Sequence, residues 1–324
     1  MRPATSADFR GTDRFRIVRR IGAGGMGVVY EAFDRQRDAR VALKYLPYAD
    51  PTALSRFKQE FRALADVAHP RLVALYELFS DHDQWFFTME FVEGVDFLTY
   101  VRGASASGPA VQATARSLVT SRDLNPLDQL LDGGADQTLV YQEGTDSLKR
   151  AELSKRQVDR LRSALRQLVE GIEQLHALGI LHRDIKPTNV LVTAAGRVVL
   201  LDFGLAADLH TVHELPSGVF DVAGTVGYMS PEQAQGRALG PASDWYNVGV
   251  MLYEVLTGRR PFSGHNEQIM LAKVSCDPHE PKSLVPGTPD DLNELCTDVL
   301  CRVPESRADG KRILTHCGAA AATD

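Results

Sequence analysis

Several features that mark secreted, zinc-binding or membrane-spanning proteins are missing from this sequence. The four cysteines all lie in the last fifth of the chain and none forms a CxxC pair, which argues against a zinc site and a disulfide framework. No run of roughly 18 apolar residues indicates a membrane span. The N-terminus lacks the apolar stretch of a signal peptide. These absences predict a soluble, cytoplasmic protein with reduced thiols.

A surplus of positive charge is missing too. The chain carries 36 Lys and Arg against 42 Asp and Glu, a formal net charge of −6. We therefore expect no broad basic face for a nucleic-acid backbone or an anionic membrane. What is present is the composition of an ordinary globular protein, 44% hydrophobic and 24% charged over 324 residues, which is long enough for one large domain or two lobes.

The N-terminal part of the chain is rich in strand patterns. Residues 15–46 predict three strands, of which the first two flank a glycine-rich turn and the third contains a lone lysine, Lys44, among apolar residues. Residues 71–79 and 84–92 predict two more strands. Between the third and fourth strands, a helix is indicated by apolar residues spaced three and four apart: Leu54, Phe57, Phe61, Leu64 and Val67.

Helical patterns dominate the second half of the chain. A long amphipathic helix is predicted over 158–175, and the apolar block 245–258 predicts a buried helix. Further helices are predicted around 266–275, 289–301 and 307–316. The predicted divisions are an N-terminal extension (1–12), a sheet-rich N-lobe (13–95), a larger helical C-lobe (96–316) with an insertion at about 104–150, and a tail (317–324).

Two motifs in the N-lobe suggest phosphate chemistry. Gly22, Gly24 and Gly27 fit GxGxxG, and glycines let backbone N–H groups approach phosphate oxygens without a Cβ in the way. Because a strand and not a helix follows this loop, a dinucleotide-binding fold is not indicated. Lys44 would be costly to bury without an anion, and Glu60 on the following helix is a candidate partner. The alternative is a lysine at a strand edge that reaches water.

Two further motifs carry carboxylates. The sequence HRDIKPTN brings a candidate proton acceptor, Asp184, a cation, Lys186, and an amide, Asn189, within six residues. A second acid, Asp202, ends a strand-like run in Leu-Asp-Phe-Gly. Asn189 and Asp202 both supply the hard oxygen ligands that suit Mg²⁺.

Six strings together resemble the motifs of eukaryotic-type protein kinases, over roughly residues 13–316 apart from the insertion: GAGGMGVV, VALK, HRDIKPTN, DFG, GTVGYMSPE and DWYNVG. The resemblance implies an α+β, two-lobed protein kinase fold. Its N-lobe would hold a small five-stranded antiparallel sheet and one helix, and its C-lobe would be larger and helical. Lys186 and Thr225 resemble those of the serine/threonine class, and GTVGYMSPEQ is most similar to bacterial Ser/Thr kinases.

The resemblance also implies an activity, the ATP-dependent transfer of the γ-phosphoryl group to Ser/Thr hydroxyls of protein substrates, the chain itself included. Asp184 would accept the hydroxyl proton and Lys186 would steady the transferring phosphoryl group. Lys44 would contact the α- and β-phosphates while paired with Glu60.

Metal, nucleotide and packing roles follow from the same resemblance. Asn189 and Asp202 would hold Mg²⁺, with Mn²⁺ as an alternative ion. Asp244 would hold the backbone of the catalytic loop, and Glu232 and Arg307 would form an ion pair beneath the substrate-binding segment. The residues that would contact the nucleotide are Ile21, Gly22, Gly24, Gly27, Val29, Ala42, Lys44, Glu90, Val92, Asp96 and Leu191.

Other functions are weighed against this one. A pseudokinase scaffold without turnover would lack the lysine or the acids that are present here, Lys44, Asp184 and Asp202. A small-molecule phosphotransferase would not need GTVGYMSPE, which is typical of peptide-substrate kinases. Residues 104–150 are either a mobile surface insertion without a catalytic role or a docking surface for a partner.

Regulation is suggested by the residue before the catalytic aspartate. Arg183 needs an anion to balance its charge, and kinases with this arginine are often switched by phosphorylation. Ser217 and Thr211 are the candidate phosphorylation sites. Asp221, a carboxylate built into the loop, is one alternative, and a solvated polar loop without a phosphorylation switch is another.

Overall fold

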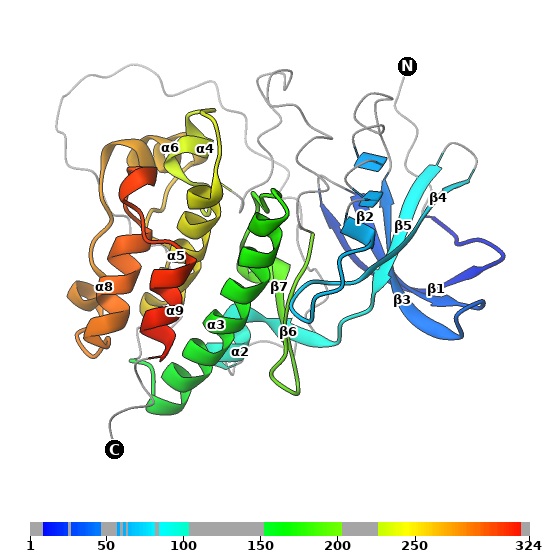
Figure 1. Ribbon diagram of the computed structural model, residues 1–324, viewed down its shortest axis with the longest axis horizontal. Coiled ribbons are helices and arrows are strands. Elements are labelled where there is room, and N and C mark those ends of the chain that lie inside the picture. The colour runs from blue at the N-terminus through cyan, green and yellow to red at the C-terminus, as the bar shows by residue number, and fades with distance from the viewer. Residues whose placement is uncertain are drawn as a thin grey trace, which may run out of the picture.

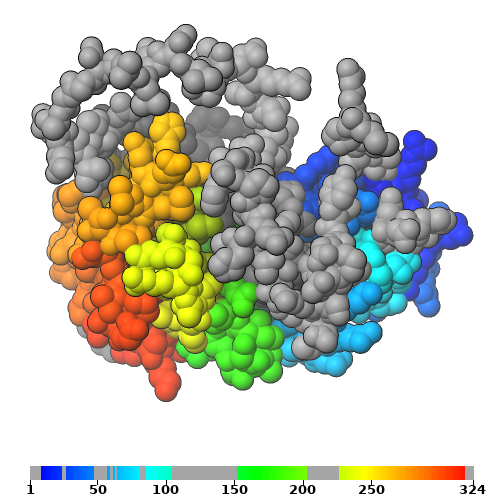
Figure 2. Space-filling model, turned by 90° about the horizontal axis from the view of Figure 1, so that it is seen from above, coloured from blue at the N-terminus to red at the C-terminus, as the bar shows by residue number. Residues whose placement is uncertain are grey.

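The structure is a computed structural model that describes residues 9–24, 27–46, 57–58, 61–62, 64–81, 84–103, 152–202 and 226–318. Strands gather at one end of the molecule and most helices at the other (Figure 1). The space-filling view shows the same division, with the sheet lobe in blue and cyan and the helical lobe in yellow to red (Figure 2). The predicted α+β class and two-lobed architecture are confirmed.

The N-terminal sheet has five antiparallel strands in the order β1-β2-β3-β5-β4. Gly24 pairs with Gly27 at the end of the first ladder, so the glycine-rich loop is the turn between β1 and β2. The central strand β3 is paired on both sides, by β2 and β5. The strands are β1 (Phe15–Gly24), β2 (Gly27–Asp34), β3 (Ala39–Leu46), β4 (Leu75–Asp81) and β5 (Gln84–Glu90).

Strand β3 is buried on both faces of this sheet. Successive side chains of a strand point to opposite faces. Ala42 and Leu46 accordingly join the main hydrophobic core, whereas Leu43 and Tyr45 pack into a second apolar cluster on the other face. Lys44 shares the parity of Ala42 and Leu46, so its side chain leaves the sheet on the side of the main core.

The helix predicted after β3 is described only in part. Phe57 and Phe61 are helical and buried, and their ring centroids lie 5.7 and 5.6 Å from that of Phe87 on β5. Leu54 lies outside the described residues, and Val67 lies beyond the end of the helix. The aromatic contacts therefore place the helix against the main-core face of the sheet.

The second face of the sheet is covered by a residue of the predicted N-terminal extension. Phe9 is only 8% exposed. Its ring centroid lies 5.0 Å from that of Phe86, 5.5 Å from Tyr45 and 6.1 Å from Tyr30. Residue 9 is thus part of the apolar core of the lobe.

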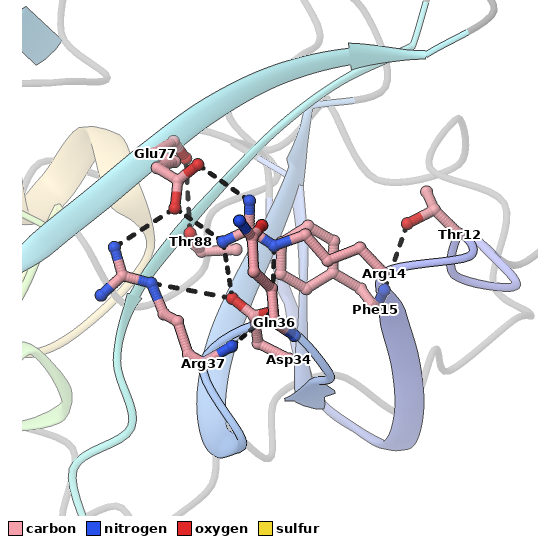
Figure 3. A network of polar contacts seen from close by, with 8 residues as sticks. All are labelled: Thr12, Arg14, Phe15, Asp34, Gln36, Arg37, Glu77 and Thr88. Carbon is pink, nitrogen blue, oxygen red and sulfur yellow. Dashed lines mark hydrogen bonds and ion pairs between the residues drawn. The ribbon is translucent and has the colours of Figure 1, made fainter.

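A network of ion pairs ties the start of β1 to the sheet (Figure 3). The Arg14 guanidinium donates to both carboxylate oxygens of Asp34 at 2.9 and 2.8 Å and to both of Glu77 at 2.9 and 2.6 Å. Arg37 adds a bond of 3.2 Å to Glu77. Bidentate pairs of this kind are strong and fix orientation, so charge links the start of β1 and the end of β2 to β4, a strand whose backbone pairs with β5.

The chain enters the C-lobe through a second, smaller sheet. Strand β6 (Gly94–Asp96) pairs with β7 (Val190–Thr193), which pairs with β8 (Val198–Leu200). Asp96 begins the short helix α2 (Phe97–Arg102) as its N-cap, where its carboxylate accepts from the Thr99 backbone N–H at 3.0 Å and from the Thr99 hydroxyl at 2.7 Å.

Helices α3 and α5 form the centre of the C-lobe. Helix α3 (Lys155–Ala177) starts at a capping box of Ser154 and Gln157 and buries the apolar stripe that the sequence predicts. Helix α5 (Pro241–Thr257) is buried almost all round, also as predicted. The remaining elements are the 3-10 turns η1 (Pro187–Asn189) and η2 (Pro304–Ser306) and the helices α4 (Pro231–Ala234), α6 (Asn266–Ser275), α7 (Pro281–Leu284), α8 (Asp290–Val299) and α9 (Gly310–Gly318).

Two predicted segments lie outside this description. The insertion at 104–150 and the loop that carries Thr211, Ser217 and Asp221 are not among the described residues, so the hypotheses about them stay predictions. Within the residues that are described, no helix combines the length and the apolar composition that a membrane crossing requires.

Candidate active site

Lys44 meets a carboxylate from the other lobe. Only 5% of Lys44 is exposed, and its Nζ lies 2.8 Å from Asp202 Oδ1. Strands β2 and β5 flank Lys44 through Val29 and Phe87, which holds the backbone of the lysine in place. The buried ammonium therefore has the anion that its burial requires.

The predicted partner of Lys44 was a different acid. Glu60 lies outside the described residues, so its pairing with Lys44 stays a prediction. The sequence assigned Asp202 to a metal ion and gave no sign that it contacts Lys44. The two residues are far apart in the chain, and only the approach of the lobes brings them together.

The catalytic loop candidates form one hydrogen-bonded group. Lys186 Nζ donates to Asp184 Oδ2 at 2.8 Å. The Asn189 amide donates to the Asp184 backbone carbonyl at 2.8 Å and to Asp184 Oδ2 at 3.0 Å. Asp184 Oδ1 is buried and has no hydrogen-bond partner in the described part of the chain. One oxygen of Asp184 is thus fixed by its neighbours while the other is left as an acceptor.

Helix α5 supplies the group that shapes this loop. Asp244 is fully buried and accepts hydrogen bonds from the backbone N–H groups of His182 at 2.9 Å and Arg183 at 2.8 Å. His176 on α3 lies 2.8 Å from the same carboxylate. Arg183 has a positive φ of 66°, a conformation that costs energy for a non-glycine residue. The prediction that Asp244 holds the loop backbone is confirmed.

Asn189 and Asp202 lie on adjacent segments of backbone. The Leu201 N–H donates to the Asn189 carbonyl at 2.8 Å, and His182 Nε2 lies 2.8 Å from the Leu201 carbonyl. Asp202 itself has a φ of 54°. These contacts place the two candidate metal holders beside one another, at the end of β8 and of η1.

The charge on Asp202 is favoured by its surroundings. Burial has the largest single effect and raises the pKa of the Asp202 carboxyl, but the charge and hydrogen bond of Lys44, together with the charges of His182 and Lys186, lower the pKa by more in sum. The net pKa lies below the ordinary value, so Asp202 is a carboxylate at neutral pH. A carboxylate beside a carboxamide oxygen is a donor set that fits Mg²⁺, whose other ligands are often water and phosphate.

No group of three or more His, Cys, Asp or Glu side chains with the arrangement of a metal site occurs in the described part of the chain. Asn189 and Asp202 would supply two donors, a number that suits an ion that substrate phosphates also bind.

The predicted nucleotide contacts come from both lobes. Ala42 on β3 and Leu191 on β7 are buried, at 6% and 8% exposure. Val29 and Val92 are half-buried against the main core. The Glu90 N–H at the end of β5 donates to the Ala74 carbonyl at 2.8 Å.

The remaining predicted contacts lie on the glycine-rich hairpin and at α2. Ile21 and Gly22 belong to β1, and Gly24 and Gly27 close the turn. Asp96 uses its carboxylate as the N-cap of α2, so a ligand would have to share it with Thr99.

A buried ion pair supports the segment around Glu232, which contacts the catalytic loop. Arg307 Nη1 donates to Glu232 Oε1 at 2.7 Å, and Ser243 donates to the same oxygen at 2.8 Å. The predicted pairing of Glu232 with Arg307 is confirmed. Gln233, which the sequence did not single out, donates to the Arg183 carbonyl at 2.8 Å. Gln233 is the last residue of the motif GTVGYMSPEQ, but the motif does not indicate a role for its side chain.

Comparison with known proteins agrees with this geometry. The protein kinase domain matches residues 15–121 and 138–317. The serine/threonine-protein kinase PrkC of Bacillus subtilis is 30% identical over 298 residues, 91% of this chain and 38% of that protein. PknA of Mycobacterium tuberculosis is 31% identical over 297 residues, 91% of this chain and 58% of that protein. PknL of the same species is 30% identical over 298 residues, which are 91% of this chain and 62% of that protein.

These relatives are longer than the chain, which spans from 38% to 62% of their length. The family match extends over both lobes and covers more than half of the chain. The chain therefore belongs to the protein kinase domain family.

Proposed function

We propose that this chain is an ATP-dependent serine/threonine protein kinase that transfers the γ-phosphoryl group to Ser and Thr hydroxyls of proteins, itself among them. The observation that carries the proposal is a continuous series of contacts. Lys44 meets Asp202, the segment of Asp202 bonds that of Asn189, and Asn189 bonds Asp184. One cation, two oxygen-bearing metal candidates and one acid are thereby gathered from two lobes.

Asp184 is the proposed proton acceptor. Lys186 and Asn189 occupy its Oδ2, which fixes the orientation of the carboxylate and leaves Oδ1 as an acceptor. A substrate hydroxyl that donates to Oδ1 would be held in line for attack and would lose its proton to the aspartate. Lys186, which donates to Oδ2 of the same carboxylate, would balance charge on the phosphoryl group as it transfers.

Asn189 and Asp202 are the proposed holders of Mg²⁺, with Mn²⁺ as a substitute. The lowered pKa of Asp202 keeps the carboxylate ionised at neutral pH. The ion would supply positive charge that neutralises the phosphate oxygens. Lys44 would add a second positive charge beside Asp202, toward the α- and β-phosphates.

The nucleotide itself would lie between the lobes. The glycine-rich hairpin would cover the phosphates with its backbone N–H groups. Ala42 and Leu191, one from each sheet, would enclose the base, with the backbone of Glu90 and Val92 at its edge. Ile21, Val29 and Asp96 complete the proposed contact set.

Protein substrates are favoured over small molecules by the support given to segment 226–233. A buried ion pair, Glu232–Arg307, and the bond from Gln233 to the catalytic loop hold this segment beside Asp184. Such an extended, fixed surface suits a peptide chain better than a small acceptor.

Docking of a partner on 104–150 and a cytoplasmic location stay predictions from the sequence.

A transfer assay tests the proposal. Radiolabelled ATP and Mg²⁺ are incubated with a generic basic protein and, separately, with small-molecule alcohols. We expect label on Ser and Thr of the protein, none with Asp184→Asn, and full transfer with Asp159→Asn, a matched change at an exposed acid of α3. Label on small molecules alone would favour the phosphotransferase alternative, and nucleotide binding without any transfer would favour the pseudokinase.

A further inference from the structure

Residues 226–230 form a short segment that is linked to the catalytic loop through the side chains of Asn247 and Gln233. Asn247 of α5 donates to the Tyr228 carbonyl at 2.6 Å and lies 3.3 Å from Gln233 Oε1. Gln233 in turn donates to the carbonyl of Arg183, the residue before Asp184. A displacement of this segment would therefore change the surface that lies beside the proposed proton acceptor.

A lysine from a distant helix lies under the same segment. Lys273 of α6 is 0% exposed, and its Nζ donates to the Gly227 carbonyl at 2.9 Å. The ammonium also lies 5.1 Å from the ring centroid of Tyr246 and 5.8 Å from that of Phe262. In the described part of the chain, no carboxylate forms an ion pair with Lys273.

Burial of a lysine without a paired anion destabilises the folded state. Burial lowers the pKa of Lys273 to about 7, and the nearby Arg260 guanidinium adds to the lowering. An apolar side chain of similar length would fill the same space without that penalty. What the lysine adds, and an apolar residue would not, is a directed bond to one particular carbonyl oxygen.

The space beside the Gly227 Cα is also occupied, by Arg260. A Cβ on Gly227 would lie 2.0 Å from Arg260 Nη1 and 2.9 Å from Arg260 Cζ. The next residue, Tyr228, donates its hydroxyl to Glu254 on α5 at 2.5 Å. The segment is thus enclosed by Arg260 on one side and anchored to α5 and α6 by Glu254 and Lys273.

We propose that Lys273 is a positioning residue for peptide substrates, because it fixes the Gly227 carbonyl and with it the segment that runs beside Asp184. The proposal rests on the protein kinase activity proposed above. It assigns to α6 a part in substrate binding that neither the sequence motifs nor the family match provides. The nucleotide site lies on other elements, so Lys273 should affect peptide binding separately from nucleotide binding.

The test compares Michaelis constants for the two substrates in Lys273→Met. The peptide is the one that wild type phosphorylates fastest from a degenerate Ser/Thr pool. We expect KM for this peptide to rise about tenfold, the effect of losing one hydrogen bond. The KM for ATP should stay within about twofold.

Two controls separate positioning from general damage. Lys311→Met removes an exposed lysine of α9, and Ile313→Ala opens a cavity at a buried position of the same helix. Loss of folded enzyme lowers the apparent kcat and leaves both Michaelis constants unchanged, so Ile313→Ala should show that signature. If Lys273→Met does not fold, Lys273→Gln replaces it, because its side chain is polar but one atom shorter.

The outcomes are distinct. A Lys273 variant with unchanged KM for the peptide, or with equal rises in both Michaelis constants, overturns the positioning role. A wild-type protein that phosphorylates no peptide overturns the proposed function instead. A rise confined to the peptide KM supports the role of Lys273.

Discussion

Two buried lysines, one in each lobe, occupy contrasting surroundings. Lys44 extends from a central strand and meets a carboxylate, Asp202, at 2.8 Å. Lys273 extends from helix α6 and meets a backbone carbonyl and two aromatic rings. Lys44 lies at the proposed phosphate site, whereas Lys273 lies beneath the segment proposed to bind the peptide.

The comparison indicates that the partner of a buried lysine decides its role. A lysine paired with a carboxylate can take part in the transfer of a charged group, whereas one bonded to a backbone carbonyl holds the backbone in place. At Lys44 the attraction between opposite charges lowers the pKa of Asp202 and keeps the pair charged, as the proposed metal and phosphate contacts would require. At Lys273 no carboxylate among the described residues compensates for burial, and the pKa of the lysine falls to about 7. The first arrangement supports transfer of a charged group, and the second fixes a backbone position.

The largest expected effect is at Lys44. Lys44→Met should lower kcat for phosphoryl transfer by roughly a thousandfold or more, because positive charge at the phosphates is lost. Initial rates of peptide phosphorylation measure this, with Lys311→Met as the matched control. A loss under tenfold would remove the functional contrast between the two lysines.

A large loss of stability is expected when the ion pair Glu232–Arg307, which lies near Lys273, is broken. Arg307 and Lys273 approach the ring of Tyr246, with cation-to-centroid distances of 5.0 and 5.1 Å. Arg307→Met should reduce the free energy of unfolding by about 3–5 kcal/mol, because Glu232 is left buried without its partner. Urea denaturation measures the change. A double variant with Glu232→Leu should recover part of the loss, and a further loss would contradict this account.

The lowered pKa of Lys273 predicts a pH dependence of stability. Between pH 7 and about 10.5 the unfolded state binds a proton at this lysine that the folded state does not, so the free energy of unfolding rises with pH in that range. The contribution is roughly 4 kcal/mol across the range. Lys273→Met should lack it, as seen by subtracting its urea-denaturation curves from those of wild type. Parallel pH profiles for the two proteins would show that Lys273 titrates normally.

A smaller effect is expected from the ion network of the N-lobe. Arg14→Met should cost about 2 kcal/mol, the scale of hydrogen bonds to charged groups, since Arg14 is partly exposed. The Arg14 hydrogen bonds lower the pKa values of Asp34 and Glu77. That stability is present above about pH 4.5, the ordinary pKa of Glu77, and is lost as the pH falls further, so the variant should lose less stability in acid. Arg10→Met, at an exposed position, is the control, and equal acid sensitivity in both variants would contradict the prediction.

Much of the site was predictable because its chemistry is local in sequence. Asp184, Lys186 and Asn189 lie within six residues, so a single string reveals the group that the structure shows bonded together. Strand alternation likewise determines on which face of β3 the side chain of Lys44 lies.

Contacts between distant segments were harder to predict. The pairing of Lys44 with Asp202 depends on how the two lobes approach each other, and the spacing of apolar residues in the sequence does not predict that approach. Phe9 lies in the predicted N-terminal extension, and its packing against the sheet was not predicted, because the sequence does not show that this apolar face offers aromatic partners.

The sequence by itself determined the two-lobed class, the family and the residue types at the catalytic loop, because these depend on short-range patterns of polarity and spacing. Tertiary structure alone decided which buried charge meets which partner. Lys273 shows why: in the sequence it is one lysine in an ordinary helix, and only the packing of α6 under Gly227 brings its ammonium to a carbonyl and away from water and every described carboxylate.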